Sequence, residues 1–189
     1  KANEMTAKLL SVVREADALL KVVRGFASVD GKAPDPVAEL AVIESDFLFA
    51  DLEIVERRVE KLEKSTKKPH PSVEKEKKEL EILLRCREQL MNEKPLSALE
   101  FKSDEEKLLR GFQFLTGKPD LVLLNLDDDI PVEEAPARFP ALFAARPDVL
   151  VLRGRVEMEL AQLPEGDRPI FMEEMGVPEL INGRVIRAC

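Results

Sequence analysis

The 189-residue sequence contains no tryptophan and no tyrosine, so its nine phenylalanines are the only aromatic side chains. This scarcity argues against a platform on which the bases of single-stranded nucleic acid would stack. No stretch approaches the roughly 18 consecutive apolar residues of a membrane-spanning helix. With 44% hydrophobic and 35% charged residues, the composition is that of a folded, water-soluble chain with one ordinary domain or two small ones.

Cysteine and histidine are also scarce. Cys86 and Cys189 are the only cysteines, which excludes a disulfide framework or a four-thiolate metal site and favours a reducing, cytoplasmic compartment. Cys86 lies among leucines, so a packed thiol is favoured over a reactive one. The single histidine, His70, lies in a proline-rich turn that we expect to be mobile, which argues against a histidine-based catalytic or metal site. The three aspartates 127–129 favour a solvated loop over a cation site, and no metal site is predicted.

A phosphate-binding loop is missing from the sequence. Such a loop needs Gly-x-x-x-x-Gly-Lys followed by Ser or Thr, so that backbone amides and the lysine bind phosphates while the hydroxyl holds Mg²⁺. Gly31-Lys32 is followed by Ala, Gly117-Lys118 by Pro, and neither pair has the upstream glycine. We therefore expect that these residues do not hydrolyse nucleotide by themselves, and that Mg²⁺ binds only together with a phosphate loop. Because the chain starts at Lys1 without an initiator Met or a secretory signal, we also expect it to begin within a longer fold.

Two long helical patterns lie between residues 31 and 99. The stretch 36–64 has no glycine and no proline after its first position, and Asp35 can cap its free amides. After a break at 67–71, Ser72 is predicted to cap a second helix that ends near Asn92, with Glu76 near the capping-box position. Apolar residues recur at coiled-coil spacing in both helices, namely Leu48, Leu52, Val55, Val59 and Leu62, then Val73, Leu80, Leu83, Leu84 and Leu90. The short loop between them predicts an antiparallel helical hairpin.

The sequence on either side of the hairpin predicts an α/β fold. Short, nearly continuous Val- and Leu-rich runs are typical of parallel strands that are buried on both faces, and helical patterns precede each of them. The strands are expected at 18–23, 121–126 and 149–152, and the helices at 3–15, 103–115 and 136–145, with short helices broken by Pro and Gly over 156–187. The predicted domains are a partial α/β domain, residues 1–30 and 100–189, and a helical insertion, residues 31–99.

Candidate binding residues follow the second and third strands. Open parallel sheets bind ligands at the carboxyl ends of their strands, where Asn125-Leu126-Asp127-Asp128 has the Asn-x-x-Asp spacing of a guanine-binding site. An aspartate can accept from both the ring imide and the exocyclic amine of guanine, whereas adenine lacks this pair of donors. The backbone amide of Gly154 can bond the base carbonyl or a ring nitrogen. Turn residues after a strand, with solvated arginines beside Gly154, explain the same pattern without a ligand.

Positive charge is concentrated at the predicted tip of the hairpin, although the formal net charge of the chain is −8. Residues 64–78 contain six lysines but only two glutamates, and this clustering indicates contact with an anionic partner. The alternative is a solvated turn whose lysines suit the dipoles of the helix ends. The six candidate residues are Lys64, Lys67, Lys68, Lys75, Lys77 and Lys78.

One segment of the first predicted helix resembles a specific family. The run Ala50-Asp51-Leu52-Glu53-Ile54-Val55-Glu56-Arg57-Arg58 is similar to the Ala-Asp-Leu-Glu-x-Val-Glu-Lys-Arg segment of the YchF family, the Obg-like ATPases within the P-loop GTPase superfamily. Further similarity covers Arg14–Ala18 with Val22–Arg24, Leu115–Pro119 and Arg184–Ala188, so the resemblance extends over essentially the whole chain. Members of this family carry the phosphate loop upstream of the part that the chain matches and a TGS domain downstream of it.

The resemblance implies a part of an ATP- or GTP-binding hydrolase that associates with ribosomes and RNA. It assigns base reading to Asn125, Leu126, Asp128 and Gly154, with Asp128 at a position that is usually Glu in the family and is associated there with a preference for ATP. The family's Ser-Ala-Lys segment falls on Arg153, Gly154 and Arg155, where only the Gly154 amide can keep its role. The rival hypothesis is a non-enzymatic module whose coiled coil binds a protein partner while the sheet serves only as a scaffold. A third reading is an active parent hydrolase of which the chain is one part.

Overall fold

The computed structural model describes residues 7–188, which form two compact units. The first unit, called the hairpin unit below, contains residues 7–19 and 42–119. The second, called the sheet unit, contains residues 20–41 and 120–188. In the hairpin unit, the segments 7–19 and 100–119 pack with the hairpin.

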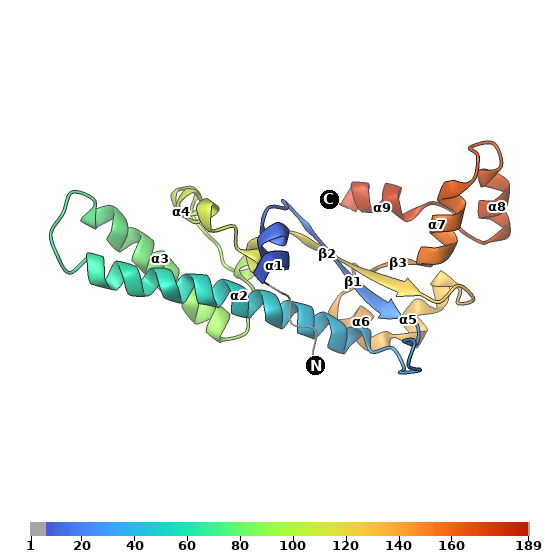
Figure 1. The fold of residues 1–189 in the computed structure, drawn as a ribbon, viewed down its shortest axis with the longest axis horizontal. Coiled ribbons are helices and arrows are strands. Elements are labelled where there is room, and N and C mark those ends of the chain that lie inside the picture. The colour runs from blue at the N-terminus through green and yellow to red at the C-terminus, as the bar shows by residue number, and fades with distance from the viewer. Residues whose placement is uncertain (1–6, 189) are drawn as a thin grey trace. The chain divides into compact units, whose positions relative to one another are not determined.

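The predicted helical hairpin is present. Helix α2 spans Pro36–Ser65 and helix α3 spans Val73–Met91, and Figure 1 shows the two lying side by side with the tip loop joining them. The Asp35 carboxylate accepts a hydrogen bond from the Ala38 amide at 3.0 Å and so caps α2 as expected. Arg58 on α2 forms two hydrogen bonds with Glu79 on α3, at 2.7 and 2.8 Å, which sets the antiparallel register of the hairpin.

The start of α3 differs from the prediction. Ser72 occupies the N-cap position, but its side chain makes no capping hydrogen bond. Glu76 does not close a capping box either, because its carboxylate accepts a hydrogen bond of 2.5 Å from the Ser65 hydroxyl at the end of α2. The glutamate therefore joins the two helices of the hairpin instead of stabilising the first turn of its own helix.

The predicted apolar spacing forms the core of the hairpin unit. Val55, Val59 and Leu62 on α2 are buried in one cluster with Ile82 and Leu83 on α3. Burial of this kind contributes roughly 1.5–3 kcal/mol for each fully buried aliphatic side chain. Cys86 belongs to the same cluster and is fully buried, and burial raises the pKa of its thiol to about 11, so the thiol is packed and uncharged at neutral pH.

The segments that complete the hairpin unit are shorter than predicted. Helix α1 spans Ala7–Arg14, and residues 3–6 of the predicted helix lie outside the described residues. The predicted helix 103–115 is wrong beyond Leu109, because Gln113 adopts a left-handed conformation, with φ of 51°, that no continuous helix allows. The observed elements are η1 (Leu96–Ala98), α4 (Ser103–Leu109), η2 (Arg110–Phe112) and η3 (Leu115–Gly117).

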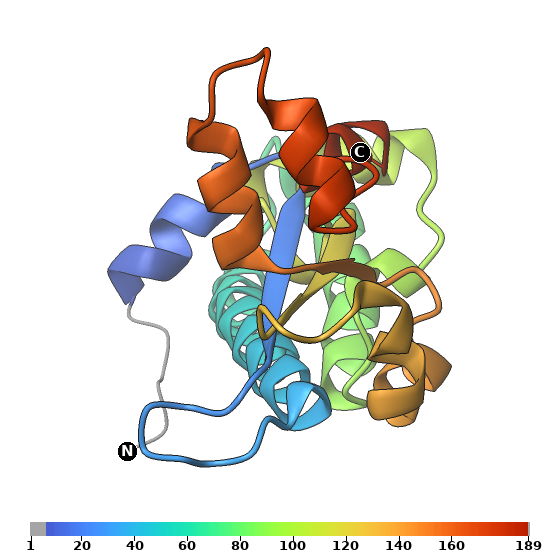
Figure 2. The ribbon, with the colours of Figure 1, turned by 90° about the vertical axis from the view of Figure 1, so that its right-hand side faces the viewer.

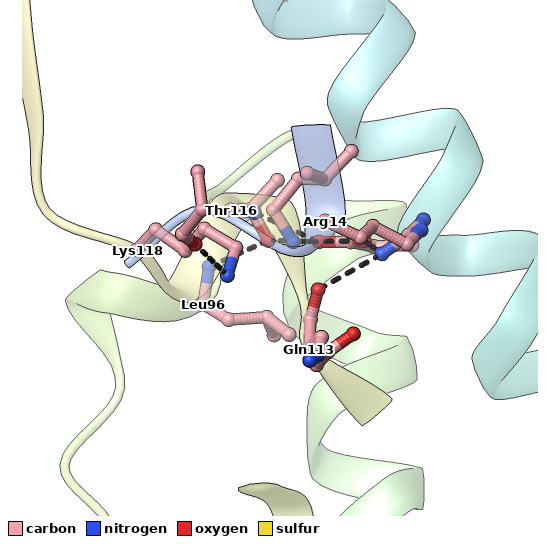
Figure 3. Close-up of polar contacts among 8 residues, drawn as sticks. Arg14, Leu96, Gln113, Thr116 and Lys118 are labelled. Atoms are coloured by element: carbon pink, nitrogen blue, oxygen red, sulfur yellow. Dashed lines mark hydrogen bonds and ion pairs between the residues drawn. The ribbon is translucent and has the colours of Figure 1, made fainter. Parts of the chain in front are cut away.

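A buried aspartate on α2 organises these segments. The Asp51 carboxylate is fully buried and accepts hydrogen bonds from Arg14 Nη1 at 2.7 Å, from the Leu115 and Thr116 amides at 3.1 and 2.8 Å, and from the Thr116 hydroxyl at 2.8 Å. Figure 3 shows the polar contacts around Arg14, Gln113, Thr116 and Lys118, where Arg14 donates to the Gln113 carbonyl and Lys118 to the Ala16 carbonyl. We call Arg14, Asp51, Leu115 and Thr116 the Asp51 cluster. It fixes α1 and the 113–118 segment to α2.

The sheet contains three strands, β1 (Leu19–Gly25), β2 (Asp120–Leu126) and β3 (Leu150–Leu152), in the order β1-β2-β3. β2 and β3 are parallel, with Asn125 opposite Leu152, and β1 runs in the same direction beside β2 (Figure 1). The α/β fold class is confirmed. The predicted burial of both faces is wrong for β1, where Leu20 and Val22 are 45% and 52% exposed, because this edge strand has one face without cover from the described part of its unit.

Short helices make up the rest of the sheet unit. The predicted helix over 136–145 is two helices, because Pro140 disfavours a helical conformation at Phe139, where the chain turns. α7 and α8 lie side by side beneath the loop at the top of Figure 2, and the predicted breaks by Pro and Gly between C-terminal helices are confirmed. Among residues 7–188, no helix combines the length and the apolar character that crossing a membrane requires. The remaining elements are η4 (Val132–Glu134), α5 (Ala135–Arg138), α6 (Pro140–Ala145), α7 (Gly154–Gln162), α8 (Arg168–Glu174) and α9 (Ile181–Ala188).

Candidate functional site

Two of the predicted base-binding residues meet at the carboxyl edge of the sheet. Asn125 is the penultimate residue of β2, and Gly154 is the first residue of α7, directly after β3. The Gly154 amide donates a hydrogen bond of 2.8 Å to Asn125 Oδ1. A carboxamide whose oxygen accepts in this way keeps both hydrogens of its nitrogen available for another acceptor. The predicted bond from the Gly154 amide to a base therefore competes with a bond that fixes Asn125.

Glycine at position 154 permits this close approach. A Cβ atom there would lie 3.0 Å from Asn125 Oδ1 and 3.1 Å from Nδ2, tighter than ordinary van der Waals contact. With any other residue the Asn125 carboxamide would have to shift by a few tenths of an ångström. The glycine in the predicted motif is thus explained by the position of the Asn125 side chain.

Asp128, the other polar residue of the motif, is half-buried in the loop that follows β2. Its carboxylate lies 3.7 Å from Arg155 Nε, and Arg155 also pairs with Glu159 at 3.4 Å. Leu126 is buried, with 2% of its surface exposed, so its side chain belongs to the core and is not presented to a ligand. The edge formed by Asn125, Asp128 and Gly154, called the base edge below, combines an amide donor with carboxylate acceptors.

Arg153 has a more defined role than the solvated side chain that the sequence suggested. It is half-buried and donates from Nη1 to the Asp128 carbonyl at 3.3 Å and from Nη2 to the Met175 carbonyl. Its Nε atom is buried and has no hydrogen-bond partner within the described part of the chain. Arg153 therefore fixes the backbone of the loop that carries Asp128.

A cavity of about 390 Å³ opens beside the base edge in the same unit. The loop after β1 supplies Gly25 and Phe26, the loop after β2 supplies Asp127, and α5 and the residue after it supply Arg138 and Phe139. The sequence patterns did not indicate this cavity, because its residues come from three distant segments. Within the described part of the chain, no three His, Cys, Asp or Glu side chains gather in an arrangement that can hold a metal ion.

The predicted anionic-partner residues gather at the hairpin tip, which we define as residues 64–78. All six lysines are exposed there. Lys64 pairs with Glu60 and Lys77 with Glu74, at 2.5 and 3.0 Å, and both pairs are solvent-exposed. Within residues 7–188, the other four lysines of the tip form no ion pair, so most of the positive charge at the tip is uncompensated. These four are Lys67, Lys68, Lys75 and Lys78.

A parallel sheet with this polar edge, and a helical hairpin inserted between its first and second strands, defines a P-loop GTPase-like α/β protein. No family model matches the sequence. Among curated proteins, the ribosome-binding ATPase YchF of Bacillus subtilis (strain 168) is 31% identical over 201 residues, and that of Escherichia coli O157:H7 is 32% identical over 196 residues. Each alignment covers 100% of this chain and 53% of the relative.

The structural comparison agrees with the sequence comparison. The YchF GTPase of Schizosaccharomyces pombe superposes with a TM-score of 0.80 at 21% identity, over 96% of this chain and 52% of that one, which establishes the shared fold. The chain belongs to the YchF family of Obg-like ATPases, as the similarity of residues 50–58 indicated. It spans about half the length of the curated relatives that it matches.

Proposed function

We propose that the chain supplies the base-binding part of the nucleotide site in a YchF-type ATP- or GTP-hydrolysing protein, and that its hairpin tip contacts the ribosome. The observation that carries the nucleotide part is the hydrogen bond of 2.8 Å between the Gly154 amide and Asn125 Oδ1. This bond orients the carboxamide at the edge of a parallel sheet where such folds bind ligands. The proposed division of labour follows the predicted domains, with residues 1–30 and 100–189 binding nucleotide and residues 31–99 binding the partner.

The base edge suits a purine. With its oxygen held by Gly154, Asn125 offers its Nδ2 hydrogens to a ring nitrogen, and Asp128 offers two carboxylate oxygens to donors of the base. Guanine presents two adjacent donors to such a carboxylate and adenine only one, so the geometry favours GTP over ATP. A nucleotide must also displace Arg155 from the Asp128 carboxylate, which lies 3.7 Å away in an exposed pair. Pairs of this kind contribute at most about 1 kcal/mol, so the displacement costs little.

The phosphate chemistry is assigned to other residues. The 189 residues contain no Gly-x-x-x-x-Gly-Lys-Ser/Thr sequence, which would hold the β- and γ-phosphates and Mg²⁺. We therefore propose that the chain by itself binds nucleotide weakly and does not hydrolyse it. The Mg²⁺ ion would then bind together with the triphosphate rather than at a carboxylate cluster of this chain.

The ribosome part rests on the charge of the hairpin tip and on the relatives that are named ribosome-binding ATPases. Exposed lysines at the end of a long helical arm can reach phosphates of ribosomal RNA without reading a base sequence. Such binding weakens steeply as the salt concentration rises, because each neutralised phosphate releases counterions. A cytoplasmic location is part of the same proposal. Binding that is unchanged between 50 and 200 mM salt, or after Glu replaces the six lysines, contradicts this part.

Nucleotide titration of the 189-residue chain tests the nucleotide part. We expect saturable binding of GTP or ATP by calorimetry, abolished by Asn125→Ala and unchanged by Asn92→Ala, a matched control at the end of α3. No binding at millimolar nucleotide would instead favour a protein-binding hairpin on an inactive scaffold. One observation favours that second candidate, since Phe49 on α2 is 71% exposed and offers an apolar contact to a partner.

A further inference from the structure

Arg153 joins two parts of the sheet unit that are distant in the sequence. Its Nη1 atom donates a hydrogen bond of 3.3 Å to the Asp128 carbonyl in the loop after β2, and its Nη2 atom donates to the Met175 carbonyl. Met175 is the C-cap residue of α8, and the last carbonyls of a helix lack partners within the helix. A cationic donor suits this end of the helix. The guanidinium therefore attaches the loop that carries Asp128 to the end of α8.

These contacts hold the backbone of Asp128 and leave its carboxylate available. The Asp128 carbonyl accepts from Arg153, and the Asp128 amide donates to Asp127 Oδ1 at 3.0 Å, so both polar backbone atoms of the residue are fixed. The carboxylate lies 3.7 Å from Arg155 Nε, and among residues 7–188 it has no closer ion pair. The residue is thus positioned through its backbone, while its side chain can accept hydrogen bonds from a ligand.

The two contacts require the shape of an arginine side chain. A guanidinium is planar and presents its donors in fixed directions, so its two terminal nitrogens can bond to two different carbonyls at once. A lysine ammonium is a single point charge and cannot occupy both positions. The Nε atom of Arg153 is buried and has no hydrogen-bond partner in the part of the chain that the structure describes. Because an unpaired buried donor costs free energy, the two terminal contacts explain the placement of this side chain.

We propose that Arg153 is a positioning residue that sets how well the base edge discriminates guanine from purines without an exocyclic amine. The inference rests on the proposed nucleotide function and gives Arg153 no contact with the nucleotide. The Asp128 carboxylate discriminates only where it can accept from both the ring imide and the exocyclic amine of guanine. Hydrogen bonds weaken steeply when they are misaligned. By attaching the Asp128 carbonyl to α8, Arg153 keeps the carboxylate in a position that allows both bonds.

GMP and IMP separate this effect from the other contacts of the base edge. The two nucleotides carry the same single phosphate and differ in the exocyclic amine, which IMP lacks. The ratio of their affinities therefore reports the position of the Asp128 carboxylate. The Asn125 carboxamide is held separately by the Gly154 amide, so its contact with a purine ring does not depend on the Arg153 side chain. The affinity for IMP reports that contact.

The binding experiment is an NMR titration of the chain with GMP and with IMP, followed at the Gly154 amide. We expect the wild type to bind GMP about tenfold more tightly than IMP, the effect of one hydrogen bond to a charged group. Arg153→Met keeps the apolar stem of the side chain and should lower this ratio to about twofold or less, with the IMP affinity unchanged. Arg153→Lys should fall between the two. Arg57→Ala, which removes an exposed arginine of the hairpin unit, is the control and should keep the wild-type ratio.

Hydrogen exchange tests the positioning step without a nucleotide. The Asp128 amide is bonded to Asp127 Oδ1 at 3.0 Å, and the Ile130 amide to the Asp127 carbonyl at 3.2 Å. We expect Arg153→Met to accelerate the exchange of these two loop amides relative to the amides of β2. A general loss of stability would instead accelerate exchange in the loop and in the strand alike.

The outcomes distinguish the role of Arg153 from the proposed function. If both nucleotides bind, an equal GMP-to-IMP ratio in wild type and Arg153→Met would overturn the role of Arg153 and leave the nucleotide function in place. Unchanged exchange of the loop amides in Arg153→Met would also overturn that role. If neither nucleotide shifts the Gly154 amide at tens of millimolar, the proposed nucleotide function and the discrimination are both wrong, whatever the exchange result.

Discussion

Two aspartates, one in each unit of the chain, have contrasting surroundings. Asp51 in the hairpin unit is fully buried, and four donors satisfy its carboxylate. Asp128 in the sheet unit is half-buried, and among residues 7–188 its carboxylate has a loose ionic neighbour, Arg155 at 3.7 Å, and no closer one. A carboxylate whose hydrogen-bonding capacity is filled by the protein has none left for a ligand. A carboxylate with unfilled hydrogen-bonding capacity, rather than an aspartate as such, therefore marks the candidate site.

The substitution with the largest expected effect on stability tests the structural role of Asp51. Asp51→Ala removes the carboxylate that pairs with the Arg14 guanidinium and accepts from two backbone amides, and removing one partner of a buried pair typically costs about 3–5 kcal/mol. We expect urea denaturation to show this loss in the free energy of unfolding. Asp104→Ala, at an exposed position, should cost no more than about 0.5 kcal/mol. Equal stabilities of the two variants would contradict the assigned role of Asp51.

The apolar core of the hairpin unit stabilises the unit without polar groups, so a buried and an exposed apolar side chain can be compared directly. Leu83→Ala should lower the free energy of unfolding by about 2–5 kcal/mol, since the side chain is fully buried and leaves a cavity. Phe49→Ala removes a larger side chain that is 71% exposed, and we expect little change. Thermal denaturation of both variants checks the difference. A larger loss from Phe49→Ala would show that α2 is covered differently in solution.

Gly154→Ala tests the proposed binding of nucleotide at the base edge. The added Cβ would lie 3.0 Å from Asn125 Oδ1 and displace the carboxamide, so we expect at least tenfold weaker nucleotide binding with a stability loss of about 1–3 kcal/mol. Gly166→Ala has no atom within 4 Å of the new Cβ and is the matched control. Calorimetric titration with GTP measures the affinity. Unchanged affinity in Gly154→Ala would show that Asn125 does not read the base.

The smallest effect concerns Glu157, a third type of carboxylate environment. Burial raises the pKa of Glu157 above its ordinary value, although the carboxylate accepts a 2.7 Å hydrogen bond from the Ile181 amide at the start of α9. The folded state therefore binds a proton more tightly than the unfolded state. Its contribution to stability is fully present below the unfolded pKa, near 4.5, and is lost as the pH rises through the folded pKa.

We expect Glu157→Gln to remove this pH dependence, with a difference below about 1 kcal/mol between acidic and neutral pH. The amide oxygen of Gln keeps an acceptor for Ile181, so the fold should be preserved. Denaturation at a series of pH values measures the effect. A wild-type stability that increases with pH relative to the variant would have the opposite sign and would contradict the assignment.

Local patterns in the sequence were sufficient to predict the long helices. Glycine-free spacing and an aspartate cap predicted α2 to within one residue, because both signals act inside a single helix. The break after Leu109 was missed, since the left-handed Gln113 has no marker in the sequence such as glycine or asparagine. The edge position of β1 was also missed, because an apolar run does not reveal how many of its faces are covered.

The sites depended on contacts between distant residues. Asn125 and Gly154 were both candidates, but their hydrogen bond spans 29 residues and required the parallel register of β2 and β3. The role of Asp51 was missed although the residue lies in the segment that carries the family resemblance, because its amide donors lie 64 and 65 residues away. Glu76 was assigned to a capping box because the local spacing fitted, whereas its partner Ser65 lies on the preceding helix.

The Asp51 cluster has a consequence for how the hairpin unit opens. The Leu115 and Thr116 amides are bonded to a side chain of another segment rather than to a neighbouring strand or turn, so fraying of their own short helix does not free them. Their exchange with solvent requires the hydrogen bonds of the Asp51 carboxylate to the 113–118 segment to break, and the same carboxylate also holds α1 through Arg14. Peripheral pieces of this unit should therefore melt together with its long helices, and these two amides should be among its slowest to exchange.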